Sequence, residues 1–138
     1  MFLRVDTTTA SAAATEIFEG AGLTQLAGGY NQLLGTDHTA GDIGLAGVAA
    51  GHCSWTTAET GVFVPVWTTG YFWFYHSGAA VTDIGNLFEA DEATDPVSVS
   101  DWGTQYAVLV GRCVDFKTNY VLLNITGYAL GAATQIGA

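Results

Sequence analysis

The sequence predicts an all-β or mostly β fold: a small barrel or sandwich with a C-terminal β-hairpin (residues 41–138), preceded by an N-terminal arm (residues 1–40). Two observations support this fold class. Short runs rich in Val, Thr and aromatic residues recur along the chain, and clusters of Gly, Asp, Asn and Ser separate them. The first residue types fit the pleated surface of a sheet, and the second are typical of turns. No internal repeat is visible. The strand candidates are Ile43–Ala50, Gly61–Val66, Tyr71–Tyr75, Pro96–Val99, Tyr106–Phe116 and Asn119–Ile125.

The N-terminal arm differs in composition from the rest of the chain. The stretch Thr7–Ala14 contains only Thr, Ala and Ser, and five glycines follow between Gly20 and Gly35. A short helix over Ser11–Phe18 and an extended segment are both open for this arm. Ordering Gly-rich backbone costs more entropy than ordering other residues. We therefore expect the arm to pack mainly on a neighbouring chain and to contribute little to its own core.

The last two strand candidates form the clearest unit. Tyr106–Phe116 and Asn119–Ile125 are apolar runs joined by the short polar link Lys117–Thr118, which predicts a β-hairpin. Neither run alternates cleanly between apolar and polar residues, so both faces of the hairpin are expected to be covered. Gly111, in the middle of the first run, suggests a bulge or a close backbone approach.

Two features mark strand boundaries. Pro65 cannot donate to a ladder, so the strand Gly61–Val66 is expected to lie at a sheet edge or to end there. The main acidic cluster lies between Asp83 and Asp101. It is expected to form an exposed loop with a strand at each margin, in which Asp95–Pro96 turns into the second strand.

Charge excludes two classes of partner. Charged residues make up 12% of the chain, whereas an ordinary soluble domain has about 25%. Three cations (Arg4, Arg112 and Lys117) stand against 13 carboxylates, which gives a net charge of −10. Nucleic acid and anionic lipid both attract clustered Lys and Arg, so neither is expected as a partner. A chain this poor in charge is expected to cover much of its surface with neighbours, or to rely on Thr, Ser, Asn and Gly for wetting.

Membrane insertion and secretion are not expected. No stretch reaches the roughly 18 apolar residues of a membrane span. The residues after Met1 lack the apolar h-region of a signal peptide. Synthesis in the cytoplasm follows as the expectation.

No spacing in the sequence indicates catalysis, a cofactor or a metal. The candidate zinc ligands are His38, His52, His76 and Cys53, and the candidate nucleophiles are the thiols of Cys53 and Cys113. Their spacing matches no zinc motif, and isolated cysteines of this kind are more often small buried hydrophobes than nucleophiles. Four carboxylates lack the spacing of an EF-hand loop and are expected in a loop that is solvated or faces the assembly: Glu89, Asp91, Glu92 and Asp95. The chain is therefore expected to be no enzyme, with no cofactor and no metal.

The aromatic run Tyr71–Tyr75 is the most unusual feature of the sequence. Strand alternation places Tyr71, Trp73 and Tyr75 on one face and the two intervening phenylalanines on the other. Tyr and Trp are favoured at buried contacts between chains. Together with Trp55 and Trp67, these three residues are the candidate interface. Burial of both faces in the core and a sugar-binding platform remain the alternatives.

Four segments from Gly61 onward carry a recognisable pattern: Gly61–Phe63, Gly78–Val81, Val110–Phe116 and Val121–Ile125. Through these segments the chain resembles small β-rich phage head decoration (capsid cement) proteins. In that family a GVF segment leads into a strand, a G-x-x-V turn opens a loop, and a V-G-R/V-x-V-x-F strand pairs with a final V-x-V-x-I strand. Upstream, Asp42–Gly51 resembles the family's opening strand, whereas residues 1–40 have no counterpart and the aromatic run is richer than in the family.

The resemblance implies a virion protein that binds the outer surface of an assembled head and stabilises it. Its partners would be the major capsid protein and further copies of itself, most often as a homotrimer, with a dimer as the other option. It would be synthesised in the host cytoplasm and end on the capsid surface, with no catalytic residues to carry over. The alternative function is a virion fibre or tail adhesion module that binds a host surface ligand.

Overall fold

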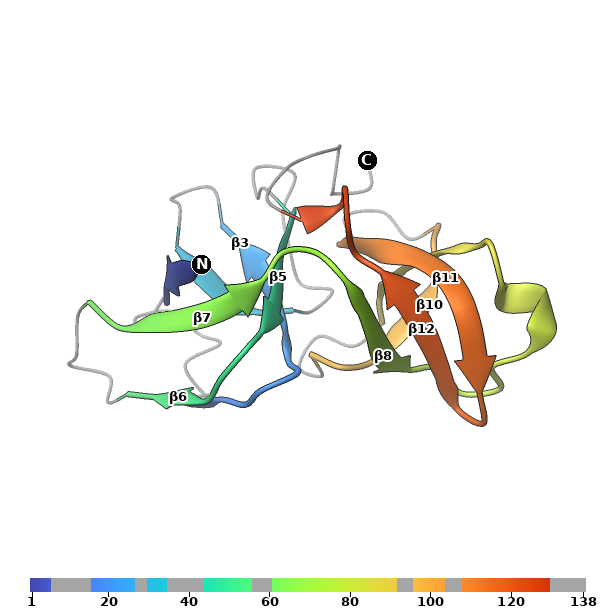
Figure 1. The fold of residues 1–138 in the computed structure, drawn as a ribbon, viewed down its shortest axis with the longest axis horizontal. Coiled ribbons are helices and arrows are strands. Elements are labelled where there is room, and N and C mark those ends of the chain that lie inside the picture. Colours follow the sequence, from blue (N-terminus) through green and yellow to red (C-terminus); the bar gives the residue numbers. More distant parts are fainter. Residues whose placement is uncertain are drawn as a thin grey trace.

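The protein is mostly β in the computed structural model, which describes residues 1–5, 16–26, 30–34, 44–55, 61–91, 96–103 and 108–129. Its strands form three sheets, and a short 3-10 turn, η2 (Val81–Asp83), interrupts the second half (Figure 1). The predicted fold class is thus confirmed, although no sheet among the described residues closes into a complete barrel.

The first sheet is built from residues on the N-terminal side of Gly70. All of its strand pairs are antiparallel. An isolated parallel bridge between Val5 and Asn31 brings the two ends of this sheet together. A separate two-stranded sheet pairs β2 (Glu16–Ile17) with β6 (Cys53–Ser54). In spatial order, the first sheet consists of β1 (Phe2–Arg4), β7 (Phe63–Trp67), β5 (Gly44–Ala49), β3 (Gly22–Gln25) and β4 (Asn31–Leu33).

The second sheet follows Gly70 and is again antiparallel throughout. Its two ends also meet at an isolated parallel bridge, between Tyr75 and Ser98. Beside this bridge, the Tyr75 N–H donates to the Val97 carbonyl at 2.8 Å. In spatial order, the second sheet consists of β10 (Val99–Asp101), β9 (Leu87–Ala90), β11 (Leu109–Lys117), β12 (Tyr120–Asn124) and β8 (Tyr71–Tyr75).

The two large sheets have the same topology. When the strands of each sheet are numbered one to five along the chain, both have the spatial order 1-5-4-2-3. In both, the parallel bridge joins the end of strand one to the start of strand three, and the register shifts between strands two and four. The structure therefore contains two copies of one five-stranded unit, a repeat that the sequence does not show.

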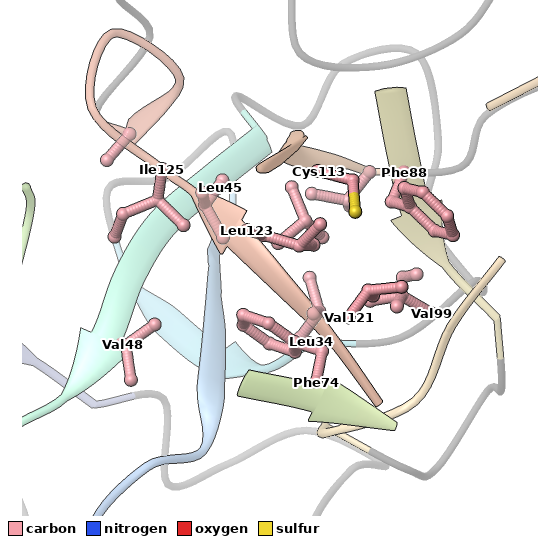
Figure 2. Packing of buried hydrophobic residues seen from close by; sticks show 14 residues of the cluster. Leu34, Leu45, Val48, Phe74, Phe88, Val99, Cys113, Val121, Leu123 and Ile125 are labelled. Atoms are coloured by element: carbon pink, nitrogen blue, oxygen red, sulfur yellow. The ribbon is translucent and has the colours of Figure 1, made fainter. Parts of the chain in front are cut away.

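The two units share a hydrophobic core. Leu34, Leu45 and Val48 come from the first unit, yet they belong to the same buried cluster as Phe74 and Leu123 of the second (Figure 2). A hydrogen bond from the Gly22 N–H to the Pro96 carbonyl, 3.0 Å long, also links the units. The units are therefore packed against each other rather than tethered by a free linker.

The expectation that residues 1–40 add little to the core was wrong for the described part of this segment. Val5, Ile17, Leu23 and Leu34 are all buried, and β1, β3 and β4 are strands of the first sheet. The glycines, which we expected to make this segment costly to order, instead allow close packing within the first unit. At Gly22, a Cβ would lie within 2.7 Å of the Leu34 side chain, so the missing side chain allows close packing here. The boundary predicted after residue 40 thus falls inside the first sheet.

Of the two conformations left open for the arm, only the end of the helical one can be compared with the structure. The short helix over Ser11–Phe18 lies mostly outside the described residues. Its described end is not helical, because Glu16–Ile17 is strand β2. A tight turn follows, in which the Ala21 N–H donates to the Phe18 carbonyl at 3.1 Å.

The predicted C-terminal hairpin is confirmed. β11 and β12 are adjacent and antiparallel, with Lys117 opposite Tyr120 at the turn. Gly111 lies at a register shift against β9, and a Cβ there would collide with the Asn124 carbonyl. Both the bulge and the close backbone approach predicted for this glycine are therefore present.

The prediction that Pro65 marks an edge or an end of its strand was wrong. Pro65 lies in the middle of β7, which has β1 on one side and β5 on the other. On the β5 side, only Val66 and Trp67 have strand partners, so Pro65 lies just outside that paired stretch, and the hydrogen bonds around it do not require its N–H. Val66 donates to the Met1 carbonyl, and the Pro65 carbonyl accepts from Ala50, both at 2.8 Å.

The acidic segment is not the exposed loop that we expected. Glu89 lies in β9 and is 1% exposed, and its carboxylate accepts the Gly103 N–H at 3.3 Å. Asp83 is also buried, and its carboxylate accepts the Ala80 N–H at 2.9 Å. A buried carboxylate needs such donors to offset its lost hydration. Asp91 and Asp101 are exposed as expected, whereas Glu92 and Asp95 lie outside the described residues.

Candidate interaction surface

Strand β8 divides its aromatic residues between core and surface. Phe74 is 1% exposed, whereas Tyr71, Trp73 and Tyr75 are 61%, 40% and 40% exposed. This is the alternation expected of a strand that has one face on the core. Phe72 is partly buried against the same core as Phe74. The prediction that Tyr71, Trp73 and Tyr75 share one face is thus confirmed. The alternative that both faces of this strand lie in the core is wrong, because these three residues are exposed.

Two residues of the hairpin complete this face. Tyr120 lies opposite Tyr75 in the sheet, and their rings meet edge to face with centroids 5.8 Å apart and an interplanar angle of 87°. The Lys117 ammonium nitrogen lies 4.3 Å from the Trp73 ring centre and 5.2 Å from the Tyr120 ring centre. Such distances are typical of cation–π contacts. We call Tyr71, Trp73, Tyr75, Lys117 and Tyr120 the C-terminal aromatic face.

The first unit carries a similar surface. Phe2, Phe63 and Trp67 point outward from β1 and β7, and Tyr30 is exposed just before β4. The Arg4 guanidinium carbon lies 5.4 Å from the Phe63 ring centre and 5.8 Å from the Tyr30 ring centre. We call these five residues the N-terminal aromatic face. Each of the two faces therefore holds one of the chain's three cations, stacked on aromatic rings.

The structure separates the five residues predicted as an interface. Tyr71, Trp73 and Tyr75 lie together on the C-terminal aromatic face, and Trp67 lies on the N-terminal one. Trp55 is 8% exposed and packs in the core of the first unit, so it belongs to neither face. Trp55 is buried because it packs with strands of residues 1–40, which the sequence had suggested were an arm.

Sequence reasoning missed six members of the two faces, namely Phe2, Arg4, Tyr30, Phe63, Lys117 and Tyr120. The alternation Phe63–Pro65–Trp67 against Val64–Val66 could have indicated the outward side of β7, but Pro65 obscured it. The role of Arg4 depends on the pairing of β1 with β7, which places it opposite Phe63.

Two contacts occupy part of the ring surface on the C-terminal aromatic face. Tyr75 and Tyr120 are nearly perpendicular, and the Lys117 ammonium lies over the Trp73 ring. Stacking of a pyranose needs an open ring face, so these contacts reduce the ring area that a sugar could use. The sugar-binding platform stays an untested alternative.

The thiol environments do not favour nucleophilic chemistry. Burial raises the pKa of Cys53, and burial together with the nearby Asp83 and Asp115 carboxylates raises the pKa of Cys113. A reactive thiol needs the opposite shift, because the thiolate is the nucleophile. Both cysteines are free, on strands of different sheets, and the Cys113 thiol donates to the Asp115 carbonyl at 3.2 Å.

The histidines engage carboxylates in pairs rather than in metal-binding clusters. His52 Nε2 lies 2.8 Å from a Glu16 carboxylate oxygen, and His76 Nε2 lies 3.7 Å from one of Asp83. Within the described residues, no group of three or more His, Cys, Asp and Glu could hold a metal ion. His38 lies outside these residues.

No protein-family model matches the chain, and neither curated proteins nor solved structures provide a match. Across the described ranges, no helix has the length and apolar character needed to cross a bilayer.

Proposed function

We propose that this protein is a non-enzymatic phage head decoration protein. It would bind the major capsid protein on the outer surface of the assembled head and stabilise the shell, as a homotrimer or a dimer. The observation that carries this proposal is the C-terminal aromatic face. Its rings are held on paired strands of a sheet, so little backbone freedom is left to lose on binding.

Three further features support binding over catalysis. The low charge of the chain leaves apolar surface for contacts. The pKa of both thiols is raised rather than lowered. The resemblance of Asp42–Ile125 to decoration proteins points the same way.

Apolar area buried at each contact contributes about 25 cal/mol per Å² before the costs of association. Repetition over many copies then stabilises a shell even where each contact is modest.

The proposal is tested by adding the purified chain to heads of the encoding phage that lack it. We expect saturable binding at a fixed ratio to the capsid protein, and electron microscopy should show extra density on the outer surface of the head. Density on a tail or fibre, or binding to host cells or glycans without head binding, would favour the adhesion alternative instead.

A further inference from the structure

The shared topology makes individual residues of the two units equivalent. Gly47 and Gly111, both in strand four, approach the carbonyls of Trp67 and Asn124, the last residues of strand five. With this alignment, Phe63 corresponds to Tyr120. The pairing of strand one with strand five then shows which strand-one residues are equivalent in the two units.

The register aligns the exposed rings of strand one as well. Phe2 lies opposite Pro65, and Trp73 lies opposite Leu122, which is the residue equivalent to Pro65. Phe2 therefore corresponds to Trp73, and both are exposed. Each unit thus presents one aromatic side chain from strand one and one from strand five at matching positions.

Both units also place a cation against the strand-five ring. Arg4 lies 5.4 Å from the Phe63 ring centre, and Lys117 lies 5.2 Å from the Tyr120 ring centre. The cations come from different strands, β1 and β11, yet they reach equivalent rings. The same chemistry therefore occurs twice although the residues that supply it differ.

We propose that the two aromatic faces are equivalent docking sites, each of which binds the same feature of a repeated partner. Each face consists of apolar rings with one cation, Arg4 or Lys117. The complementary feature of the partner is therefore an apolar protein patch that contains a carboxylate. This inference rests on the proposed function, in which the partner is the lattice of major capsid protein subunits. One chain would then bridge two lattice positions and stabilise the shell by linking them.

The chain connection keeps one edge of each face close to the other. Trp67 ends the N-terminal aromatic face and Tyr71 begins the other, and four residue steps span at most about 14 Å. The shared core around Leu34 and Val48 prevents the units from moving independently. Two linked contacts of this kind raise the apparent affinity by about 10²–10⁴ over one contact alone.

The test compares binding of four variants with that of the unaltered chain on purified heads that lack the protein. Phe2→Ala with Arg4→Ala deletes the cation and one ring of the first face, Trp73→Ala with Lys117→Ala does the same to the second, and a fourfold variant combines all four changes. Val81→Ala, at an exposed residue outside both faces, is the matched control. Circular dichroism verifies that each variant is folded. We expect each single-face variant to lose about 10²–10⁴ in apparent affinity, the fourfold variant to lose binding, and the control to lose none.

The outcomes distinguish the two proposals. If the unaltered chain does not bind heads, the proposed function fails and two-site docking on the capsid fails with it. If the chain binds but only one face matters, or neither does, then two-site docking is wrong while head binding stands. Lys117→Glu tests the partner's charge, because it should weaken binding more than Lys117→Ala does. Equal binding of these two variants would contradict a carboxylate in the partner patch.

Discussion

Gly47 and Gly111 occupy the same position in the two units, although they are far apart in the sequence. Each lies in strand four beside a register shift, and a Cβ at either would collide with the carbonyl of the last residue in strand five. The close approach of strands four and five in each unit therefore depends on a missing side chain.

Substitution of either glycine should destabilise the protein. We expect Gly111→Ala to lower the free energy of unfolding by about 1–3 kcal/mol, because overpacking forces the paired backbones apart. Gly47→Ala should cost at least as much, since Gly47 also has φ of +150°. Urea titration followed by circular dichroism measures both effects. Val114→Ala, at an exposed position of the same strand as Gly111, is the control, and equal losses for Gly111→Ala and Val114→Ala would contradict the close approach.

Trp55 and Trp73 should differ in their contribution to stability. Trp55 is in the core, so Trp55→Ala should lower the free energy of unfolding by about 3–5 kcal/mol through lost burial and a cavity. Trp73→Ala should cost roughly 1 kcal/mol or less, because its ring is partly exposed and its contact with Lys117 is a surface cation–π pair. Guanidinium titration of the two variants gives the comparison, and a reversed order would place the wrong tryptophan in the core.

A truncated chain that begins at residue 42 should fail to fold. The truncation removes β1, β3 and β4, which leaves β7 and β5 without their outer neighbours and removes Leu23 and Leu34 from the cores. This result reverses the expectation drawn from the glycine-rich sequence alone. Nuclear magnetic resonance spectra with collapsed amide dispersion would agree with it, whereas a dispersed spectrum would show that residues 1–40 are a dispensable arm.

Stability should decline in alkaline solution through Cys113. Burial raises the pKa of this thiol in the folded protein, so the folded state favours the protonated form. The stabilisation is complete below the unfolded thiol pKa, about 8.5, and is lost as the pH rises toward the folded value. Urea midpoints measured from pH 7 to 10 should therefore fall more steeply for the unaltered chain than for Cys113→Ala. Parallel slopes would mean that Cys113 does not contribute.

The local features of the C-terminal half could be predicted from the sequence. The alternation of exposed and buried rings along Tyr71–Tyr75 follows from the two-residue period of a strand, and the hairpin follows from two apolar runs with a short polar link. The bulge at Gly111 could also be predicted locally, because a glycine in the middle of a strand usually marks a bulge or a close backbone approach. Each of these conclusions depends on residues that are close in the sequence.

The relationships between distant segments required the tertiary structure. Whether Trp55 is buried depends on the strands that cover it, and whether Pro65 lies at an edge depends on β1, some 60 positions earlier in the chain. Glu89 is buried in β9, which lies between β10 and β11, and the N–H of the distant Gly103 donates to its carboxylate. The twofold repeat is also invisible in the sequence, since a strand order is set by long-range pairing and different residues satisfy it in each unit. By itself, the sequence determined the β class, the alternation of β8, the hairpin and the net charge. The tertiary structure alone decided which residues meet on each aromatic face, because cross-strand pairing sets those neighbours.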